Sequence, residues 1–176
     1  MPVIPCRWLQ CEGLSDNNST RAFKSMFKSA FQGGPSFEVF SCQGSSSSAI
    51  LNWRIQNKQF VRKEYEKDVK GYCYSCEKSG KLSFPKDDKQ SAYLIQPYLI
   101  LQTFVSVGQH MSLEICVSDL NQTKRRFFTS TAAREIKNTA LHVTLPIGFM
   151  KRGVWLNLCF DLLSLVRRYF FVLDLT

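Results

Sequence analysis

A chain of 176 residues, 44% of them hydrophobic, is long enough for one domain with a substantial core and too short for two. Its 23 lysines and arginines exceed its 14 acidic residues, and residues 26–176 carry +8 of the net charge of +9. This excess favours acidic partners such as nucleic acid, an anionic membrane or an acidic protein surface, and the alternative is a charge that only aids solubility. No apolar run approaches the roughly 20 residues of a membrane helix. The seven cysteines, with no recognisable secretory signal, predict reduced thiols and a cytoplasmic location.

Residues 1–25 show no periodicity, which predicts a disordered leader, and the domain is expected to begin near Met26. Beyond it, apolar and polar residues alternate in short segments with the period of two that places one face of a strand in a core. The expected strands are 37–39, 51–56, 60–65, 69–76, 98–107, 111–118, 124–128, 141–145 and 154–160. Residues 98–107 are expected to be buried on both faces, and residues 132–139 to form one helical turn.

Short strands separated by turns, with scarcely any 3.6-residue period, are typical of a β-sandwich or a jelly roll. The sequence therefore predicts an all-β fold, a two-layer β-sandwich that forms a single domain over residues 26–176.

A predicted β-hairpin joins residues 111–118 to a second strand that begins with Lys124, Arg125 and Arg126. On a strand, Lys124 and Arg126 share one face, and Arg125 lies on the other with Phe127. Because a planar guanidinium binds carboxylates in a bidentate manner, Arg126 beside Lys124 suits an acidic protein surface such as that of tubulin. The alternative is a solvated hairpin end.

A second basic run contains Arg62 and Lys63, with Phe60 expected on the same side of a strand as Arg62. Aromatic and cationic side chains interleaved in this way can bind single-stranded nucleic acid. Packing of Phe60 in the core, with Lys63 as surface charge, explains the run better. Both basic runs are candidate protein-binding sites.

Little in the chain predicts catalysis or a bound cofactor. Cys73 and Cys76 have the spacing of half a zinc site, but no second close cysteine pair accompanies them, and positions 73 and 76 of a strand face opposite ways. His110 and His142, the two histidines, accompany no nucleophile elbow, phosphate-binding loop or metalloprotease motif. We expect no metal, no cofactor, no small-molecule substrate and no enzymatic activity.

Three segments, in order, carry a family resemblance: residues 26–34 (MFKSAFQGG), Lys124–Phe127 with Ser130, and residues 153–163 (GVWLNLCFDLL). Over about residues 26–166 the chain resembles the cilia- and flagella-associated protein twenty family, and within it a longer, domain-containing paralogue. The resemblance implies a β-sandwich without catalytic residues. It also implies a structural role in the axoneme of the cilium, at the inner junction of doublet microtubules, beside tubulin and other junction proteins.

The chain departs from this family pattern at both ends. The family has no segment that corresponds to residues 1–25. After the position of Leu163 it normally continues through further strands that return to the sheet, whereas this sequence stops at Thr176. The difference suggests an isoform from alternative splicing, truncated at its C-terminus. Residues 167–175 are expected either to form a replacement strand or to leave an adhesive sheet edge that lowers stability.

Taken together, the residues and the resemblance predict a non-enzymatic interaction module that docks on axonemal or other cytoskeletal microtubules through a basic surface. A nucleic-acid-binding β module is the alternative, because the basic body and the aromatic residues Phe60, Phe127 and Phe128 also suit a phosphate backbone.

Overall fold

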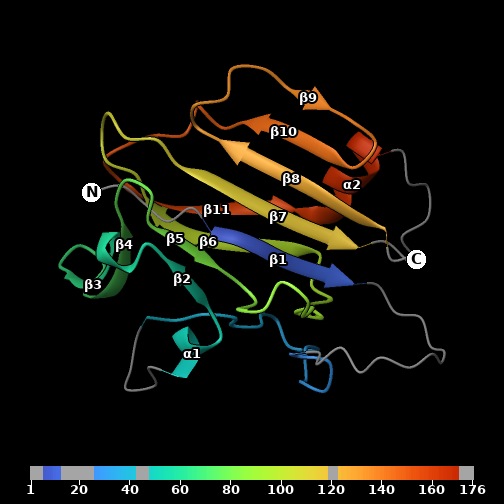
Figure 1. Ribbon diagram of the computed structural model, residues 1–176, viewed down its shortest axis with the longest axis horizontal. Coiled ribbons are helices and arrows are strands. Elements are labelled where there is room, and N and C mark those ends of the chain that lie inside the picture. Colours follow the sequence, from blue (N-terminus) through green and yellow to red (C-terminus); the bar gives the residue numbers. More distant parts are fainter. Residues whose placement is uncertain (1–5, 13–25, 43–47, 119–122, 171–176) are drawn as a thin grey trace.

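The computed structural model describes residues 6–12, 26–42, 48–118 and 123–170, with the backbone alone for residues 6–12, 48 and 49. Strands predominate in these residues and form one seven-stranded sheet and two sheets of two strands (Figure 1). The prediction of a mostly β protein is confirmed.

The seven-stranded sheet is mixed. Its strands are, in order across the sheet, β2 (Arg54–Gln56), β5 (Lys81–Ser83), β1 (Cys6–Glu12), β7 (Ser112–Ser118), β8 (Lys124–Ser130), β10 (His142–Pro146) and β9 (Lys137–Asn138). The predicted hairpin is confirmed, because β7 and β8 pair antiparallel with Ser118 opposite Lys124. In contrast, β10 runs parallel to β8, and β1 runs parallel to both of its neighbours.

The two smaller sheets are antiparallel pairs. Strand β6 (Tyr98–Phe104) pairs with β11 (Trp155–Asp161) along its whole length, and β3 (Val61–Glu66) pairs with β4 (Gly71–Cys76). In Figure 1 the pair β6–β11 lies behind the large sheet, with helix α2 (Leu162–Phe170) beside it.

The hydrophobic core lies between the large sheet and the elements behind it. Alternate residues of β7 and β8 point into it, so Leu113, Ile115 and Phe127 are buried and pack with Val166 and Phe170 of α2. The rings of Phe127 and Phe170 meet edge to face, with their centroids 5.2 Å apart. The inner face of the large sheet and helix α2 therefore contribute to one core.

The structure differs from the expected disordered leader at residues 6–12, which form β1 inside the large sheet. Cys6 and Arg7 pair with β5, and Gln10, Cys11 and Glu12 pair with β7. Without β1, the facing edges of β5 and β7 would lose these backbone partners, and unpaired buried backbone groups are costly. The other leader residues, 1–5 and 13–25, lie outside the described residues.

The expected replacement strand at residues 167–175 is wrong over residues 167–170, because they belong to helix α2. Leu162, Val166 and Phe170 are buried at a spacing of four residues, which is the period of a helix face. Asp161 caps this helix, since its carboxylate accepts hydrogen bonds from the Ser164 backbone N–H at 3.0 Å and from the Ser164 hydroxyl at 2.7 Å. Residues 171–176 lie outside the described residues.

Four local predictions also need correction. Residues 37–39 form no strand, Leu51 lies in helix α1 (Ser48–Leu51) instead of a strand, and residues 132–139 contain β9 instead of a helical turn. The outer face of β6 is not buried, because Tyr98 is 58% and Ile100 66% exposed. The first three are short segments, in which the local preference for helix or strand is outweighed by tertiary contacts.

Candidate interaction surface

The basic run on β8 is divided between the two faces of the large sheet. Phe127 is fully buried on the inner face, whereas Phe128 is 41% exposed on the outer face. Side chains alternate along a strand, so Lys124 and Arg126 share the outer face with Phe128. The predicted common face of Lys124 and Arg126 is thus confirmed.

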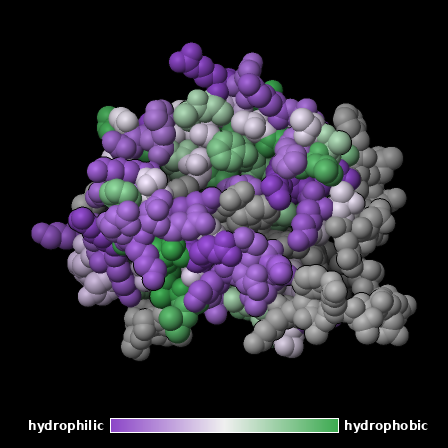
Figure 2. All heavy atoms as spheres, viewed as in Figure 1, coloured by the Kyte–Doolittle hydropathy of each residue, from purple (hydrophilic) through white to green (hydrophobic). Residues whose placement is uncertain are grey.

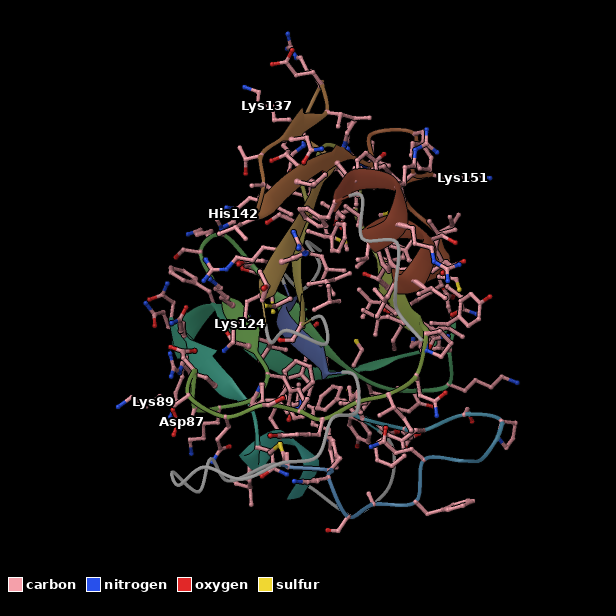
Figure 3. All side chains as sticks on the ribbon, turned by 90° about the vertical axis from the view of Figure 1, so that its right-hand side faces the viewer. Asp87, Lys89, Lys124, Lys137, His142 and Lys151 are labelled. Carbon is pink, nitrogen blue, oxygen red and sulfur yellow. The ribbon has the colours of Figure 1, made fainter. Side chains whose placement is uncertain are left out.

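The parallel pairing of β10 with β8 brings further polar residues to this outer face. His142 lies opposite Arg126, Thr144 lies opposite Phe128, and Lys137 on β9 pairs with Thr144. We call Lys124, Arg126, His142 and Lys137, together with Phe128, the basic strip. Figure 3 shows Lys124, His142 and Lys137 on the same side of the molecule, away from Lys151.

The hydrophilic character of this face is interrupted by a small apolar area. Figure 2 shows mainly hydrophilic side chains on the front of the molecule, with an apolar area over β8 and β10. Exposed Phe128 belongs to these strands. A few aromatic and arginine side chains usually contribute most of the binding energy of a protein interface, and this area combines an exposed aromatic ring with cations.

Two cations of the basic strip have carboxylate partners. The Nε atom of Arg126 lies 3.9 Å from Oε1 of Glu114, and Nζ of Lys137 lies 3.2 Å from Oε1 of Glu135. The Lys137–Glu135 pair is exposed on both sides, and such pairs contribute about 0–1 kcal/mol to stability and are screened by salt, whereas the Glu114 side chain is only 16% exposed. Because the exposed pair contributes little energy, an incoming carboxylate can compete with Glu135 for Lys137.

Arg125, the third predicted cation, has a different environment. Its guanidinium lies over the ring of Phe170, 5.0 Å from the centroid, and donates a hydrogen bond of 2.9 Å to the Ala140 carbonyl. The structure places Arg125 on the side of α2, where it joins the helix and the loop before β10 to the sheet. We therefore leave it out of the basic strip.

Arg62 and Lys63 lie on β3, in a different sheet, and Figure 1 places this strand apart from β8. The Nζ atom of Lys63 lies 5.0 Å from the ring centroid of Tyr72. Phe60 belongs to a short 3-10 helix instead of the strand, and Nζ of Lys78 covers its ring at 5.0 Å. The expected row of aromatic and cationic side chains is therefore wrong.

Cys73 and Cys76 lie on β4 in environments that disfavour the thiolate. Burial raises the pKa of Cys76 from 9.0 to about 12, and Cys73 also has a raised pKa, through burial and the nearby carboxylates of Glu66 and Glu64. Reactive or metal-binding thiols need the opposite shift. Within the described residues no group of three or more metal-ligating side chains comes together.

These environments predict an order of reaction with iodoacetamide. At pH 8 the 2%-exposed thiol of Cys76 is expected to react at least about a hundred-fold more slowly than the exposed thiol of Cys159, because its access to the reagent and its thiolate fraction are both low. Mass spectrometry of a time course measures the order. Equal rates for the two thiols in the folded protein would contradict the buried position of Cys76.

A family comparison covers most of the chain. The CFA20 domain model matches residues 26–173. The chain belongs to the CFA20 domain family. This family is associated with cilia and flagella and is generally non-catalytic. The match includes every described element from α1 to α2 and leaves β1 outside. The particular paralogue and the isoform stay predictions.

The CFA20 domain contains no membrane-crossing helix among its described residues, since none is long and apolar enough. Its basic strip includes two residues, Lys137 and His142, that sequence reasoning did not assign to the site. These two residues lie near Lys124 and Arg126 because β10 pairs in parallel with β8. No local sequence pattern predicts that pairing.

Proposed function

We propose that this CFA20 domain is a non-enzymatic interaction module with an incomplete two-layer β-sandwich, which docks on an acidic surface of axonemal microtubules through the basic strip. The observation that carries the proposal is the convergence of Lys124, Arg126 and Lys137 on one face around exposed Phe128. The family association with cilia and flagella supports the axonemal partner.

The sheet gives the basic strip a defined geometry. Lys124 and Arg126 are two residues apart on one strand, which separates their Cα atoms by roughly 7 Å. Hydrogen-bonded neighbours on both sides hold β8, so little backbone conformational freedom is lost on binding. Lysine and arginine at this spacing suit a row of carboxylates, and Phe128 adds apolar contact area.

A nucleic-acid partner has less support. Single-strand binding uses exposed aromatic rings as stacking platforms. Of the three aromatic residues proposed for it, Phe127 is buried and the ring of Phe60 is covered by Lys78, which leaves Phe128. One exposed ring and a few cations fit a protein surface better than a run of bases.

Charge reversal tests the basic strip. In the double variant Lys124→Glu and Arg126→Glu, we expect microtubule affinity to fall at least about ten-fold, because two attractive contacts become repulsive. The affinity that remains should depend less on salt than that of the wild type. Cosedimentation with microtubules over a range of salt concentrations measures both quantities.

The matched control is the double variant Lys151→Glu and Arg167→Glu. It makes the same change in net charge at exposed positions that lie outside β8, β9 and β10, one of them on helix α2. Figure 3 shows Lys151 on the other side of the molecule from Lys124. Equal loss of affinity in both variants would show that net charge, rather than the basic strip, governs binding. Tighter binding of the wild type to single-stranded nucleic acid than to microtubules would favour the alternative function.

A further inference from the structure

The basic strip contains one side chain of a type that changes its charge near neutral pH. Lysine and arginine stay protonated in this range, whereas an imidazole ordinarily gains or loses a proton between about pH 5 and pH 8. His142, one of the two histidines of the chain, is exposed at the start of β10. Figure 3 shows it on the same side of the molecule as Lys124 and Lys137. Within the basic strip, His142 is therefore the residue that can respond to a change of pH in this range.

Backbone hydrogen bonds hold His142 beside Arg126. The Arg126 N–H donates a hydrogen bond of 2.9 Å to the Leu141 carbonyl, and the parallel pairing of β10 with β8 then places His142 opposite Arg126. Before β10, the Thr139 hydroxyl accepts a hydrogen bond of 3.1 Å from the His142 N–H. Val143, the next residue, is 1% exposed on the inner face, so the His142 side chain lies on the outer face. The imidazole is thus fixed next to a permanent cation.

The charged groups that accompany His142 come from β7, β8, and β9 with the residue two positions before it. They are Lys124, Arg126, Lys137, Glu114 and Glu135. Both carboxylates already contact a cation, since Glu114 lies 3.9 Å from Arg126 and Glu135 lies 3.2 Å from Lys137. The His142 ring has no hydrogen bond or ion pair with any described residue, and Asp119, between β7 and β8, lies outside those residues. A carboxylate of a partner can therefore approach the ring.

We propose that protonation of His142 strengthens the binding of the basic strip to an acidic surface, so that the affinity rises as the pH falls toward 6. This inference rests on the proposed function, because it names a regulation of the same strip. A partner carboxylate beside the ring favours its protonated form, so formation of the complex is coupled to uptake of a proton. The contribution is complete below the pH range in which the free ring titrates, and it is lost as the pH rises through the range in which the bound ring titrates.

Microtubule cosedimentation between pH 6 and pH 7.5, at constant ionic strength, tests this proposal. For the wild type we expect an affinity about three-fold higher at pH 6, which is the size of one exposed ion pair. His142→Asn removes the titratable ring, so this three-fold change should disappear. His142→Lys keeps a permanent charge and should bind at pH 7.5 about as tightly as the wild type does at pH 6. Any pH dependence of the microtubule itself is common to all variants.

His110→Asn is the matched control, because it removes the other histidine. His110 is exposed in the loop between β6 and β7, where its Nδ1 atom lies 3.5 Å from Oγ1 of Thr131, beyond the end of β8 that is distant from Lys124. We expect this variant to keep the pH dependence of the wild type. Equal pH dependence in the wild type and His142→Asn would overturn the proposal, and so would loss of the pH dependence in His110→Asn.

Failure of this proposal can be distinguished from failure of the proposed function. If reversal of Lys124 and Arg126 weakens binding while His142→Asn keeps the pH dependence of the wild type, the proposed function stands and the role of His142 is wrong. If the reversal leaves the affinity unchanged, docking through the basic strip is wrong, and the role of His142 is rejected with it.

Discussion

Replacement of Phe127 by alanine is expected to lower the free energy of unfolding by about 3–5 kcal/mol, which is the usual cost of truncating a buried aromatic residue. Phe127 is fully buried and packs on Phe170 of α2, so its truncation would leave a cavity between the helix and the large sheet. A domain is stable by only about 5–15 kcal/mol in total. Urea denaturation measures the change.

Phe128→Ala is the matched control, because it removes the same side chain from the neighbouring position of β8. Phe128 is 41% exposed on the outer face, so we expect a cost below about 1 kcal/mol. A larger cost for Phe128→Ala than for Phe127→Ala would mean that β8 presents its other face to the core, and the basic strip would then not exist.

Deletion of residues 1–25 is expected to lower the free energy of unfolding by about 3 kcal/mol or more, since β1 pairs with both β5 and β7. Among the described strands, β1 is the one that joins the β2–β5 pair to the rest of the large sheet. Thermal melting by circular dichroism measures the loss, and hydrogen exchange should show faster exchange at residues 112–118.

A shorter deletion of residues 1–5 retains β1 and serves as the control, with an unchanged melting temperature expected. A synthetic peptide of residues 6–12 added to the longer deletion should restore part of the stability. If the longer deletion melts at the same temperature as the full chain, residues 6–12 do not hold the two parts of the sheet together.

The strands with strict alternation were the ones that could be predicted from sequence. In β7 and β11, every second residue is apolar over seven positions, which distinguishes the two faces without knowledge of the partner strands. Helix α2 was missed because Leu162, Val166 and Phe170 lie within a run that also contains Leu163, Leu165 and Tyr169. An almost continuous apolar run fits a strand as well as a helix.

Elements that depend on distant partners could not be predicted. Strand β9 has two residues and exists through its pairing with β10, and β1 exists through its pairing with two strands more than 70 residues away in sequence. The candidate site was predicted in part for the same reason. Lys124 and Arg126 are close in sequence, whereas Lys137 joins them through β10 alone.

The basic strip is polar and lies on a hydrogen-bonded sheet, so the proposed binding to an acidic surface should weaken with salt.

Site-specific crosslinking tests the basic strip most directly. A photoreactive phenylalanine analogue replaces either Phe128, within the basic strip, or Phe149, which is 90% exposed in the loop that carries Lys151. After irradiation with microtubules, we expect a tubulin adduct from position 128 and little or none from position 149. Adducts from position 149 alone, or in equal amount from both positions, would contradict docking through the basic strip.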